Sequence, residues 1–191
     1  MALVISDMSI SLDGYVTGPN DSRENPFGEG AEMLHDWIFD AATDDDRAVL
    51  QATLDDVGAI VMGRTSFDKN EGDGGWGDAG PVGDTPCFVV THTKPTASHP
   101  PVFTFITDGV VSAIEQAKSA AGDKGVALFG ATIMQQALPL GLVDEIRVHV
   151  IPVLLGGGTP LFGTLDASIN LERIEARATR AATHIAFRVI Q

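Results

Sequence analysis

The sequence predicts an α/β protein with a central, mostly parallel sheet that becomes antiparallel toward its C-terminal end, with helices on both faces. Short apolar runs alternate with segments in which apolar residues recur at helical spacing, as expected for a parallel sheet. Residues 174–189 differ, because two stretches of alternating apolar and polar residues flank the turn sequence TRAAT and predict a hairpin. With 44% hydrophobic composition, residues 1–191 are interpreted as one domain with a sizeable core.

The first part of the chain predicts one strand, a loop and two helices. Residues 3–11 are an apolar strand that ends at the sequence SLDG, and residues 20–30 are polar and turn-rich. The helix expected over residues 31–42 has one apolar face, formed by Leu34, Trp37, Ile38 and Ala41. In the next helix, TDDDRAVLQATL, Thr43 and Asp46 have the spacing of a capping box, and we favour a helix start over a metal site for its three aspartates.

The rest of the chain alternates strands with helices and one long loop. Residues 69–84 form a glycine-rich acidic loop around Trp76, and apolar residues spaced over 110–121 predict a helix. A further helix begins after Gly130 and should end at Pro139. The predicted strands after residue 58 cover residues 59–62, 88–91, 102–107, 126–129 and 146–150.

Charge and cysteine content exclude several classes of protein. A formal net charge of −14 argues against nucleic-acid binding, because that binding needs clustered Lys and Arg. The single cysteine, Cys87, cannot form a disulfide within the chain and begins an apolar run, so we expect a buried thiol. No secretion signal precedes the first strand and no apolar run is long enough to span a membrane, so we expect a cytoplasmic protein.

Three predicted strands end in residues that suit phosphate binding. In IVMGRTSF, Gly63 lets the backbone approach a ligand, Arg64 can grip a phosphate with two parallel hydrogen bonds, and Thr65 adds a hydroxyl. The strand end VVTHTKP places a second polar cluster in a chain with only 12 Lys and Arg: Thr91, His92, Thr93 and Lys94. In FGAT, backbone N–H groups at a helix start suit a pyrophosphate. Taken alone, each segment is also consistent with a capped helix or a polar turn.

Together the three strand ends indicate two phosphate sites beside a pyrophosphate site, which suits a dinucleotide with an extra phosphate. The G-x-G-x-x-G fingerprint is missing, so a fold other than the standard Rossmann fold is expected. The motifs of zinc deaminases, H-E-x-x-H enzymes, G-x-S-x-G hydrolases and P-loop proteins are missing too. The five histidines are scattered without metal-ligand spacing, so no metal is expected.

Five segments, in order along residues 3–190, resemble one known family. They are SISLDGYVTGP, AIVMGRTSF, FVVTHTKP, FGATIMQQAL and GLVDEIRVHVIPVLLGGGTPLF. They are similar to the dihydrofolate reductase-like proteins related to the C-terminal reductase domain of the bifunctional riboflavin-biosynthesis deaminase/reductase. The resemblance implies a dihydrofolate reductase-like fold, NADPH as the cofactor and a homodimer.

The resemblance also assigns the adenosine half of NADPH to the strand ends. The residues that would hold the adenosine-side phosphates are Gly63, Arg64 and Thr65. Those that would flank the adenosine and its 2′-phosphate are Thr91, His92 and, as our own addition, Lys94. The pyrophosphate would lie on Gly130, Ala131, Thr132 and Ile133.

The same resemblance places the reacting end of the cofactor near the first strand. The nicotinamide would lie against Ser9, Val16, Thr17 and Gly18. Asp13 is the only carboxylate of the loop after that strand and is our candidate catalytic residue, although it could instead only form an Asp-Gly turn. Leu34 and Trp37 would border the substrate, or Trp37 could belong to the core. Leu34 stands where dihydrofolate reductases carry a carboxylate, so folate reduction is not expected.

We therefore predict an NADPH-dependent reductase that transfers a hydride to a small heterocyclic (pteridine- or pyrimidine-like) or carbonyl substrate. No second basic cluster is present for a substrate that carries a ribose phosphate. The alternative is a nucleotide-binding module of the same fold without turnover, acting as a sensor or an interaction protein. The expected partners are a small-molecule substrate and a second copy of the chain.

Overall fold

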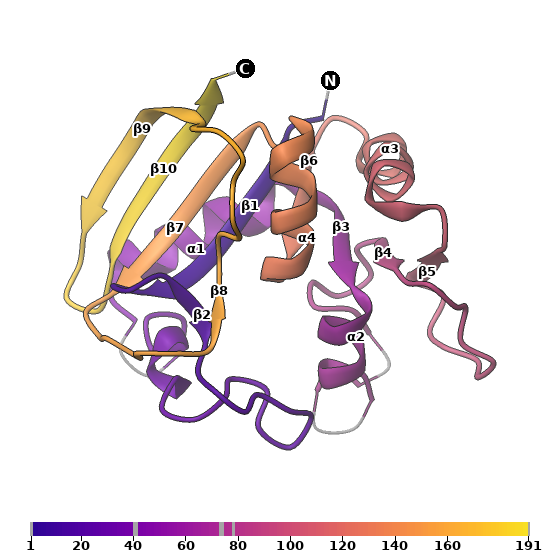
Figure 1. Cartoon of the computed structure of the whole chain (residues 1–191), viewed down its shortest axis with the longest axis horizontal. Helices are drawn as coiled ribbons and strands as arrows, with labels where there is room; N and C mark the ends of the chain where they lie inside the picture. The colour runs from indigo at the N-terminus through magenta and orange to yellow at the C-terminus, as the bar shows by residue number, and fades with distance from the viewer. Residues whose placement is uncertain (1, 40–41, 73–74, 78, 191) are drawn as a thin grey trace.

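The computed structural model describes residues 2–39, 42–72, 75–77 and 79–190, and an eight-stranded sheet forms its centre (Figure 1). Its strands are β1 (Val4–Ser11), β3 (Val57–Gly63), β4 (Cys87–Val90), β5 (Phe103–Ile106), β6 (Gly125–Phe129), β7 (Glu145–Ile151), β9 (Asn170–Ala178) and β10 (Thr183–Ile190). Their spatial order is β5-β4-β3-β6-β1-β7-β10-β9. The first six in that order run parallel, and β10 pairs antiparallel with β7 and β9, as the sequence predicts. A separate small sheet consists of β2 (Tyr15–Thr17) and β8 (Thr159–Pro160).

Parallel pairing brings the carboxyl ends of β4, β3, β6 and β1 to one edge of the main sheet. Gly63 at the end of β3 pairs with Val90 at the end of β4. Met62, the residue before Gly63, pairs with Phe129 at the end of β6. The turns that follow these strands therefore lie side by side, although they are far apart in the sequence.

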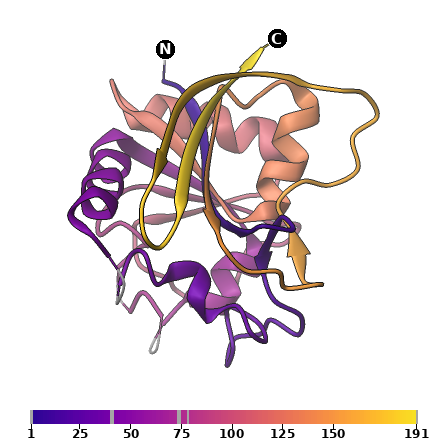
Figure 2. The ribbon, with the colours of Figure 1, turned by 90° about the vertical axis from the view of Figure 1, so that its left-hand side faces the viewer.

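Helices cover both faces of the main sheet (Figure 2). They are α1 (Asp44–Asp56), α2 (Arg64–Asn70), α3 (Gly109–Ala121) and α4 (Ala131–Ala137), with the short 3₁₀ turns η1 (Glu32–His35) and η2 (Leu138–Leu140). The helices α3 and α4 pack on one face of the sheet, and α1 lies on the opposite face (Figure 2).

The two faces of the sheet differ in polarity because side chains alternate along each strand. On β1 and β7, Val4 and Ile146 belong to the hydrophobic core that packs under α3 and α4. Asp7 and His149 lie on the opposite face, where Thr53 of α1 donates a hydrogen bond to Asp7 at 2.9 Å. At β1 and β7 the sheet is thus apolar toward α3 and α4 and polar toward α1.

The helix α1 begins with the predicted capping box. The Thr43 hydroxyl accepts a hydrogen bond from the Asp46 N–H at 3.2 Å, and the Asp46 carboxylate accepts one from the Thr43 N–H at 2.7 Å. Asp44 and Asp45 remain exposed in the first turn, where their charges are favourable for the helix dipole. Asp46 is instead fully buried, and this burial gives it a second role in the packing of α1 on the sheet.

The prediction of a helix over residues 31–42 is wrong, because the described residues of this segment form only the 3₁₀ turn η1. Leu34 and Trp37 are buried, as the apolar spacing indicates. The spacing therefore identifies the buried side of this segment but not a long helix, and Ala31 before the turn supplies no side-chain cap. Residues 40 and 41 of the predicted helix lie outside the described residues.

The remaining predicted strands and helices are confirmed, and the short strands β2 and β8 were not predicted. Cys87 is fully buried, as expected, and burial raises the pKa of its thiol to about 12. The helix α2 extends into the glycine-rich loop predicted over 69–84, of which residues 73, 74 and 78 lie outside the described residues. Within the described ranges, no helix is both long and apolar enough to cross a membrane.

Candidate functional site

The turns that follow β3, β4 and β6 line one groove at the carboxyl edge of the sheet. A wide cavity of about 460 Å³ lies between the turns after β3 and β4. A narrow cavity of about 160 Å³ lies toward β1 and β2. Thr65, Ser66 and Thr132 line both cavities, which joins the two into one groove. Even without the narrow cavity, the volume of the wide cavity lies within the roughly 300–1,000 Å³ that is typical of small-molecule sites.

Most of the residues predicted to bind the cofactor line this groove. They are Val16, Thr17, Gly63, Arg64, Thr65, Thr91, His92, Gly130, Ala131, Thr132 and Ile133. The predicted cofactor residues that line neither cavity are Ser9, Gly18 and Lys94. The structure thus brings together the three strand ends that the sequence singles out.

Arg64 bridges α2 and the turn after β4. Its Nε donates a hydrogen bond to Asp68 at 2.6 Å, and its Nη1 donates one to the Thr93 carbonyl oxygen at 3.5 Å. The side chain is 38% exposed and lines the wide cavity. Because a guanidinium has five N–H donors, these contacts leave donors for an anion in the cavity.

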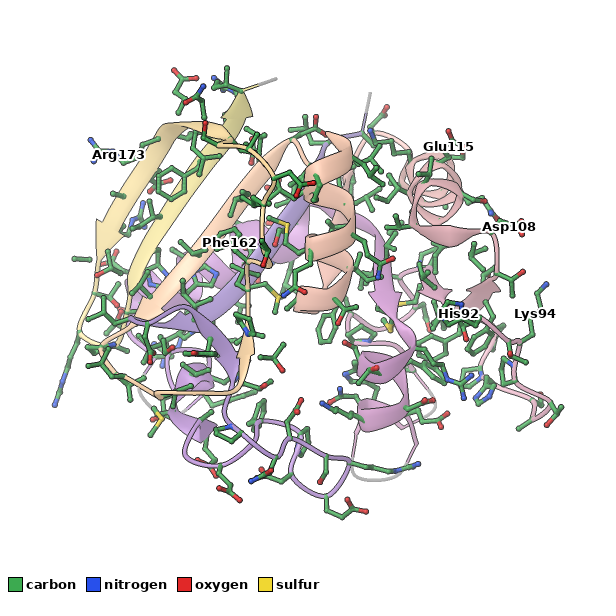
Figure 3. The ribbon with its side chains drawn as sticks, viewed as in Figure 1. His92, Lys94, Asp108, Glu115, Phe162 and Arg173 are labelled. Carbon is green, nitrogen blue, oxygen red and sulfur yellow. The ribbon has the colours of Figure 1, made fainter. Side chains whose placement is uncertain are left out.

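The turn after β4 is fixed by its own threonines. The Thr91 hydroxyl donates a hydrogen bond to the Thr93 carbonyl oxygen at 3.0 Å and accepts one from the Thr93 N–H at 3.3 Å. His92 is exposed at the tip of this turn and lines the wide cavity. Lys94 lies farther out (Figure 3) and lines a different cavity, together with His99. Of these two basic residues, Arg64 therefore lines the wide cavity and Lys94 does not.

Gly130 brings the turn after β6 into close contact with α2. Its φ of 95° is one that glycine adopts readily, and a Cβ at this position would clash with Ser66 Oγ. Neither Gly130 at the start of α4 nor Gly63 at the start of α2 supplies a side-chain cap. The first amide groups of both helices therefore keep hydrogen-bonding capacity for a ligand.

The narrow cavity is bordered by residues 19–30, a segment that we call the strap. The Gly18 N–H donates a hydrogen bond to the Phe27 carbonyl oxygen, and the Glu29 N–H donates one to the Pro19 carbonyl oxygen, both at 2.8 Å. A Cβ on Gly18 would clash with the backbone of Glu29. Gly18 therefore allows the strap to fold back closely on itself, and this packing explains why it does not line the cavity.

Within the described ranges, two polar atoms of residues that line the narrow cavity are buried without a hydrogen-bond partner, Thr17 Oγ1 and His35 Nδ1. Burial lowers the pKa of His35 to about 4, so its imidazole is neutral at pH 7. The His35 ring lies 4.6 Å from the ring of Phe27. Because buried polar groups normally have partners, these two atoms are candidates for contacts with a ligand.

The sequence-based predictions omit Lys69, which lines the narrow cavity and forms an ion pair with Asp21 of the strap. The side chains of Lys69 and Asp21 are 18% and 23% exposed. Burial lowers the pKa of Lys69. A signal was present, because Ser66, Lys69 and Asn70 stand at helical spacing i, i+3, i+4 and share one face of α2.

Asp13, the predicted catalytic residue, lines neither cavity and instead fixes a loop. Its carboxylate accepts hydrogen bonds from the Ser11 hydroxyl at 2.6 Å, the Leu155 N–H at 3.1 Å and the Gly156 N–H at 2.7 Å. The bond from Ser11 and those from the two amides lower the pKa of Asp13 to about 2. The carboxylate is therefore ionised at pH 7, and its contacts match a structural role in the turn.

Ser9, Leu34 and Trp37 are buried away from the groove. Side chains alternate along β1, so Ser9 lies on the face opposite Met8, which lines the narrow cavity. The Trp37 indole donates a hydrogen bond from Nε1 to Ser9 Oγ at 2.8 Å, and its ring centre lies 4.2 Å from that of His149. Leu34 and Trp37 are thus core residues in this structure, and the Ser9 hydroxyl positions the indole.

Four side chains on the α1 face form a hydrogen-bonded series, the partly buried Asp7 and the buried His149, His184 and Asp46, which we call the Asp–His chain. Asp7 Oδ1 lies 2.7 Å from His149 Nε2, the two Nδ1 atoms lie 2.8 Å apart, and His184 Nε2 lies 2.9 Å from Asp46 Oδ1. A cavity of about 320 Å³ adjoins this chain between α1 and the sheet. In the described part of the protein, no group of three or more His, Cys, Asp and Glu residues could hold a metal ion.

The two carboxylates set the hydrogen-bond directions in the Asp–His chain. Burial opposes ionisation of Asp7 and Asp46, but their hydrogen bonds prevail and lower both pKa values, that of Asp46 to about 2. Both carboxylates are therefore ionised and accept an Nε2–H. At the contact between the two Nδ1 atoms, one ring nitrogen donates and the other accepts, and burial lowers the pKa of His184.

Known proteins are similar to this chain in sequence or in structure over nearly its whole length. The uncharacterized protein YyaP of Bacillus subtilis (strain 168) is 29% identical over 189 residues, covering 91% of this chain and 87% of YyaP. The crystal structure of a "putative riboflavin biosynthesis protein" from Shewanella sp. PV-4 has a TM-score of 0.73 at 23% identity and covers 100% of both chains. Dihydrofolate reductase from Enterococcus faecalis, complexed with NADP(H), has a TM-score of 0.58 at 11% identity and covers 99% of this chain and 97% of its own.

These similarities confirm the predicted fold class, a mostly parallel sheet of the dihydrofolate reductase type with an antiparallel C-terminal end. The family model of the RibD C-terminal domain matches residues 2–185. The chain therefore belongs to the RibD C-terminal domain family and has its reductase-like fold.

Proposed function

We propose that this protein is an NADPH-dependent reductase that transfers a hydride to a small heterocyclic or carbonyl acceptor. The observation that carries the proposal is the convergence of three turns, after β3, β4 and β6, on one groove. The groove combines the Arg64 guanidinium, several threonine hydroxyls and amide groups without side-chain caps. These are the donors that phosphate groups need, so the residues present fit a phosphorylated dinucleotide.

The wide cavity would hold the adenosine half of NADPH. Arg64 and Thr65 would contact the adenosine-side phosphates, and His92 would lie beside the 2′-phosphate. Arg64 would bind a phosphate with its remaining donors, or would exchange its contact with Asp68, whose side chain is 45% exposed. Exposed ion pairs contribute only about 0–1 kcal/mol, so this exchange costs little.

The turn at Gly130 would hold the pyrophosphate where the two cavities join. Its backbone leaves no room for a side chain next to Ser66, and Thr132 reaches both cavities. The nicotinamide would enter the narrow cavity beside Val16 and Thr17, whose hydroxyl has no hydrogen-bond partner among the described residues. Bound NADPH supplies the hydride, and the protein contributes positioning and the exclusion of water.

The similarity to an NADP(H)-complexed dihydrofolate reductase supports the choice of cofactor but not folate as the substrate. The carboxylate that lines the narrow cavity, Asp21, is already paired with Lys69. Leu34, which stands where dihydrofolate reductases carry their carboxylate, is fully buried. A small acceptor other than folate therefore suits this cavity best.

Isothermal titration calorimetry with NADPH and NADH tests the cofactor assignment. We expect NADPH to bind more tightly than NADH, because Arg64 and His92 would contact the extra phosphate. NADPH at a hundredfold excess over its Kd should raise the free energy of unfolding by about 2.7 kcal/mol. If millimolar NADPH neither binds nor raises the melting temperature, the proposed function is wrong.

The second candidate function is a nucleotide-binding module without turnover. This function is favoured because Asp13, the candidate catalytic residue, is ionised and hydrogen-bonded to the backbone N–H groups of Leu155 and Gly156. The loss of NADPH absorbance in the presence of 7,8-dihydropterin, menadione or benzaldehyde distinguishes the two functions. Turnover of any one of these acceptors supports the reductase. Binding of NADPH with no turnover of any of the three supports the module.

A further inference from the structure

Of the residues that the structure describes, three titratable ones line the narrow cavity, Asp21, His35 and Lys69. Lys69 extends from α2 and pairs with Asp21 of the strap. A second contact lies nearby, where Arg23 of the strap donates a hydrogen bond to the Glu71 carbonyl oxygen at 3.2 Å. The strap, which runs from β2 toward α2 (Figure 1), is thus fastened at the end of α2, and the fastening places a charged pair on the cavity wall.

Lys69 is the group of this wall that can donate a proton at neutral pH. His35 is neutral, because burial lowers its pKa to about 4. Asp21 is the carboxylate partner of an ammonium group. The hydroxyls of Thr17 and Ser66 are far weaker acids than an ammonium group. The cavity therefore has one strong candidate for an acid, and it lies beside the position expected for the nicotinamide.

We propose that Lys69 is the proton donor to the acceptor substrate and that Asp21 positions its ammonium group. This inference rests on the proposed reductase function, because it requires the nicotinamide in the narrow cavity. The Lys69 side chain is 18% exposed, so it can regain a proton from water while it faces the cavity. Asp13, the candidate from the sequence, lies outside the cavity and is ionised.

The step balances in atoms and electrons. The acceptor carbon gains a hydride, with its two electrons, from the reduced nicotinamide, and the π bond of the C=N or C=O group breaks. The nitrogen or oxygen of that group takes a proton from the Lys69 ammonium. The products are oxidised NADP⁺, the reduced acceptor and a neutral Lys69 amine, which then takes a proton from water.

The pairing of Lys69 with Asp21 also restricts the class of acceptor. The positive charge of Lys69 is balanced by Asp21, so the wall offers no free cation to a phosphate or carboxylate on the substrate. A charged group without a partner is costly to bury. Met8, Phe27 and Phe129 give the same cavity apolar walls. The acceptor is therefore an uncharged ring or carbonyl compound with one heteroatom that takes up a proton.

Acetylation of the lysines with acetic anhydride, quantified for each lysine by mass spectrometry, tests the position of Lys69 without a turnover assay. The chain has four lysines, so Lys118 and Lys124 serve as internal references and Lys94 reports the turn after β4. Saturating NADPH should slow acetylation of Lys69 about tenfold, equivalent to 1.4 kcal/mol, and leave Lys118 and Lys124 unchanged. Calorimetry on the same sample measures NADPH binding separately.

The labelling experiment separates failure of this inference from failure of the proposed function. If NADPH binds and Lys69 is acetylated at the same rate as in the free protein, Lys69 does not border the nicotinamide and the inference is overturned. The proposed cofactor would still stand in that case. If NADPH does not bind at all, the proposed function fails and the role of Lys69 fails with it.

Kinetics of Lys69→Met, Lys69→Arg and the control Lys124→Met test the donor role with the acceptors named above. The wild-type kcat should fall as pH rises through the pKa of Lys69, because only the ammonium form donates. Lys69→Met should lower kcat at least about a hundredfold and abolish this pH dependence, while the Kd of NADPH changes little. Lys69→Arg should move the fall in kcat to higher pH, and Lys124→Met should match the wild type.

A purely structural role for Lys69 predicts a different pattern. Loss of the strap contact alone would raise KM and lower the melting temperature, and Asp21→Asn would do the same. The alkaline fall in kcat would then persist in Lys69→Met. That result, or a Lys69→Met kcat equal to the wild-type value, overturns the donor role.

Discussion

The groove at the carboxyl edge of the sheet and the Asp–His chain on its α1 face use polar residues in opposite ways. In the chain, both ring nitrogens of each histidine have a hydrogen-bond partner. In the groove, Thr17 Oγ1 and His35 Nδ1 are buried and have none in the described structure. The two regions meet at neighbouring residues of β1: Asp7 belongs to the Asp–His chain, and the next residue, Met8, lines the narrow cavity.

The comparison shows how structure and function can be separated in a protein of this kind. Histidine and aspartate residues attract attention as catalytic candidates, yet those of the Asp–His chain are all committed to each other and hold α1 against β1, β7 and β10. Buried polar groups without partners are unfavourable unless a ligand completes them. The groove, and not the more conspicuous chain, is therefore the region that we expect to bind the cofactor.

The largest expected effect comes from breaking the chain with His149→Phe. The substitution removes the imidazole that contacts His184 and Asp7, whose side chain is only 13% exposed. A buried polar group that loses its partner costs about 1–3 kcal/mol, so the loss of two contacts should lower the free energy of unfolding by about 2–6 kcal/mol in urea at pH 7. Arg173→Ala, a change at an exposed residue of β9 (Figure 3), is the control and should cost less than about 0.5 kcal/mol. A fall of less than about 1 kcal/mol in His149→Phe would mean that the chain does not stabilise the fold.

A smaller effect is expected in the pH dependence of the free energy of unfolding, through Asp46 of the Asp–His chain. The pKa of Asp46 is about 2 in the folded protein, against 3.8 for a free aspartate. Because the folded value is depressed, the stabilisation is complete above about pH 4 and is lost as pH falls through about 2, and it amounts to about 2 kcal/mol. We expect the difference in unfolding free energy between the wild type and Asp46→Asn to shrink by this amount between about pH 5 and pH 2. A difference that stays constant over this range would contradict the role of the Asp46 charge.

The smallest expected effect concerns the groove and tests whether Arg64 contributes to cofactor binding. Arg64→Ala should reduce the preference for NADPH over NADH about tenfold, because one charged hydrogen bond contributes about 1.5–3 kcal/mol. Stability should change little, since the Arg64–Asp68 pair is partly exposed. Arg47→Ala, which removes an exposed ion pair with Asp44 on α1, is the matched control for binding. An unchanged ratio of the two dissociation constants, measured by calorimetry, would exclude Arg64 from the 2′-phosphate or its neighbourhood.

The sequence singles out many of the residues that line the groove because its signals are local. Gly63, Arg64, Thr91 and Gly130 each stand within a few residues of a strand end, and the order of strands and helices indicates a mostly parallel sheet. In such a sheet, neighbouring strand ends share one edge. The prediction therefore needed the fold class and the turn residues but no knowledge of distant contacts.

The sequence does not predict the pairs that depend on strand order and register. Lys69 and Asp21 are separated by 48 positions, and Asp7 and His149 by 142. Asp13 is the only carboxylate in its loop, but one of its hydrogen-bond donors is Gly156, 143 positions away. Nothing near these residues in the chain indicates their partners. The homodimer, the single domain and the cytoplasmic location stay predictions.

A crystal structure of the protein with NADPH tests most directly the claim that three turns form one cofactor site. We expect the adenosine half in the wide cavity near Arg64 and His92, the pyrophosphate at Gly130, and the nicotinamide in the narrow cavity within reach of Lys69. Electron density for NADPH in the cavity between α1 and the sheet, beside the Asp–His chain, would contradict the claim. So would a bound NADPH that contacts only one of the three turns.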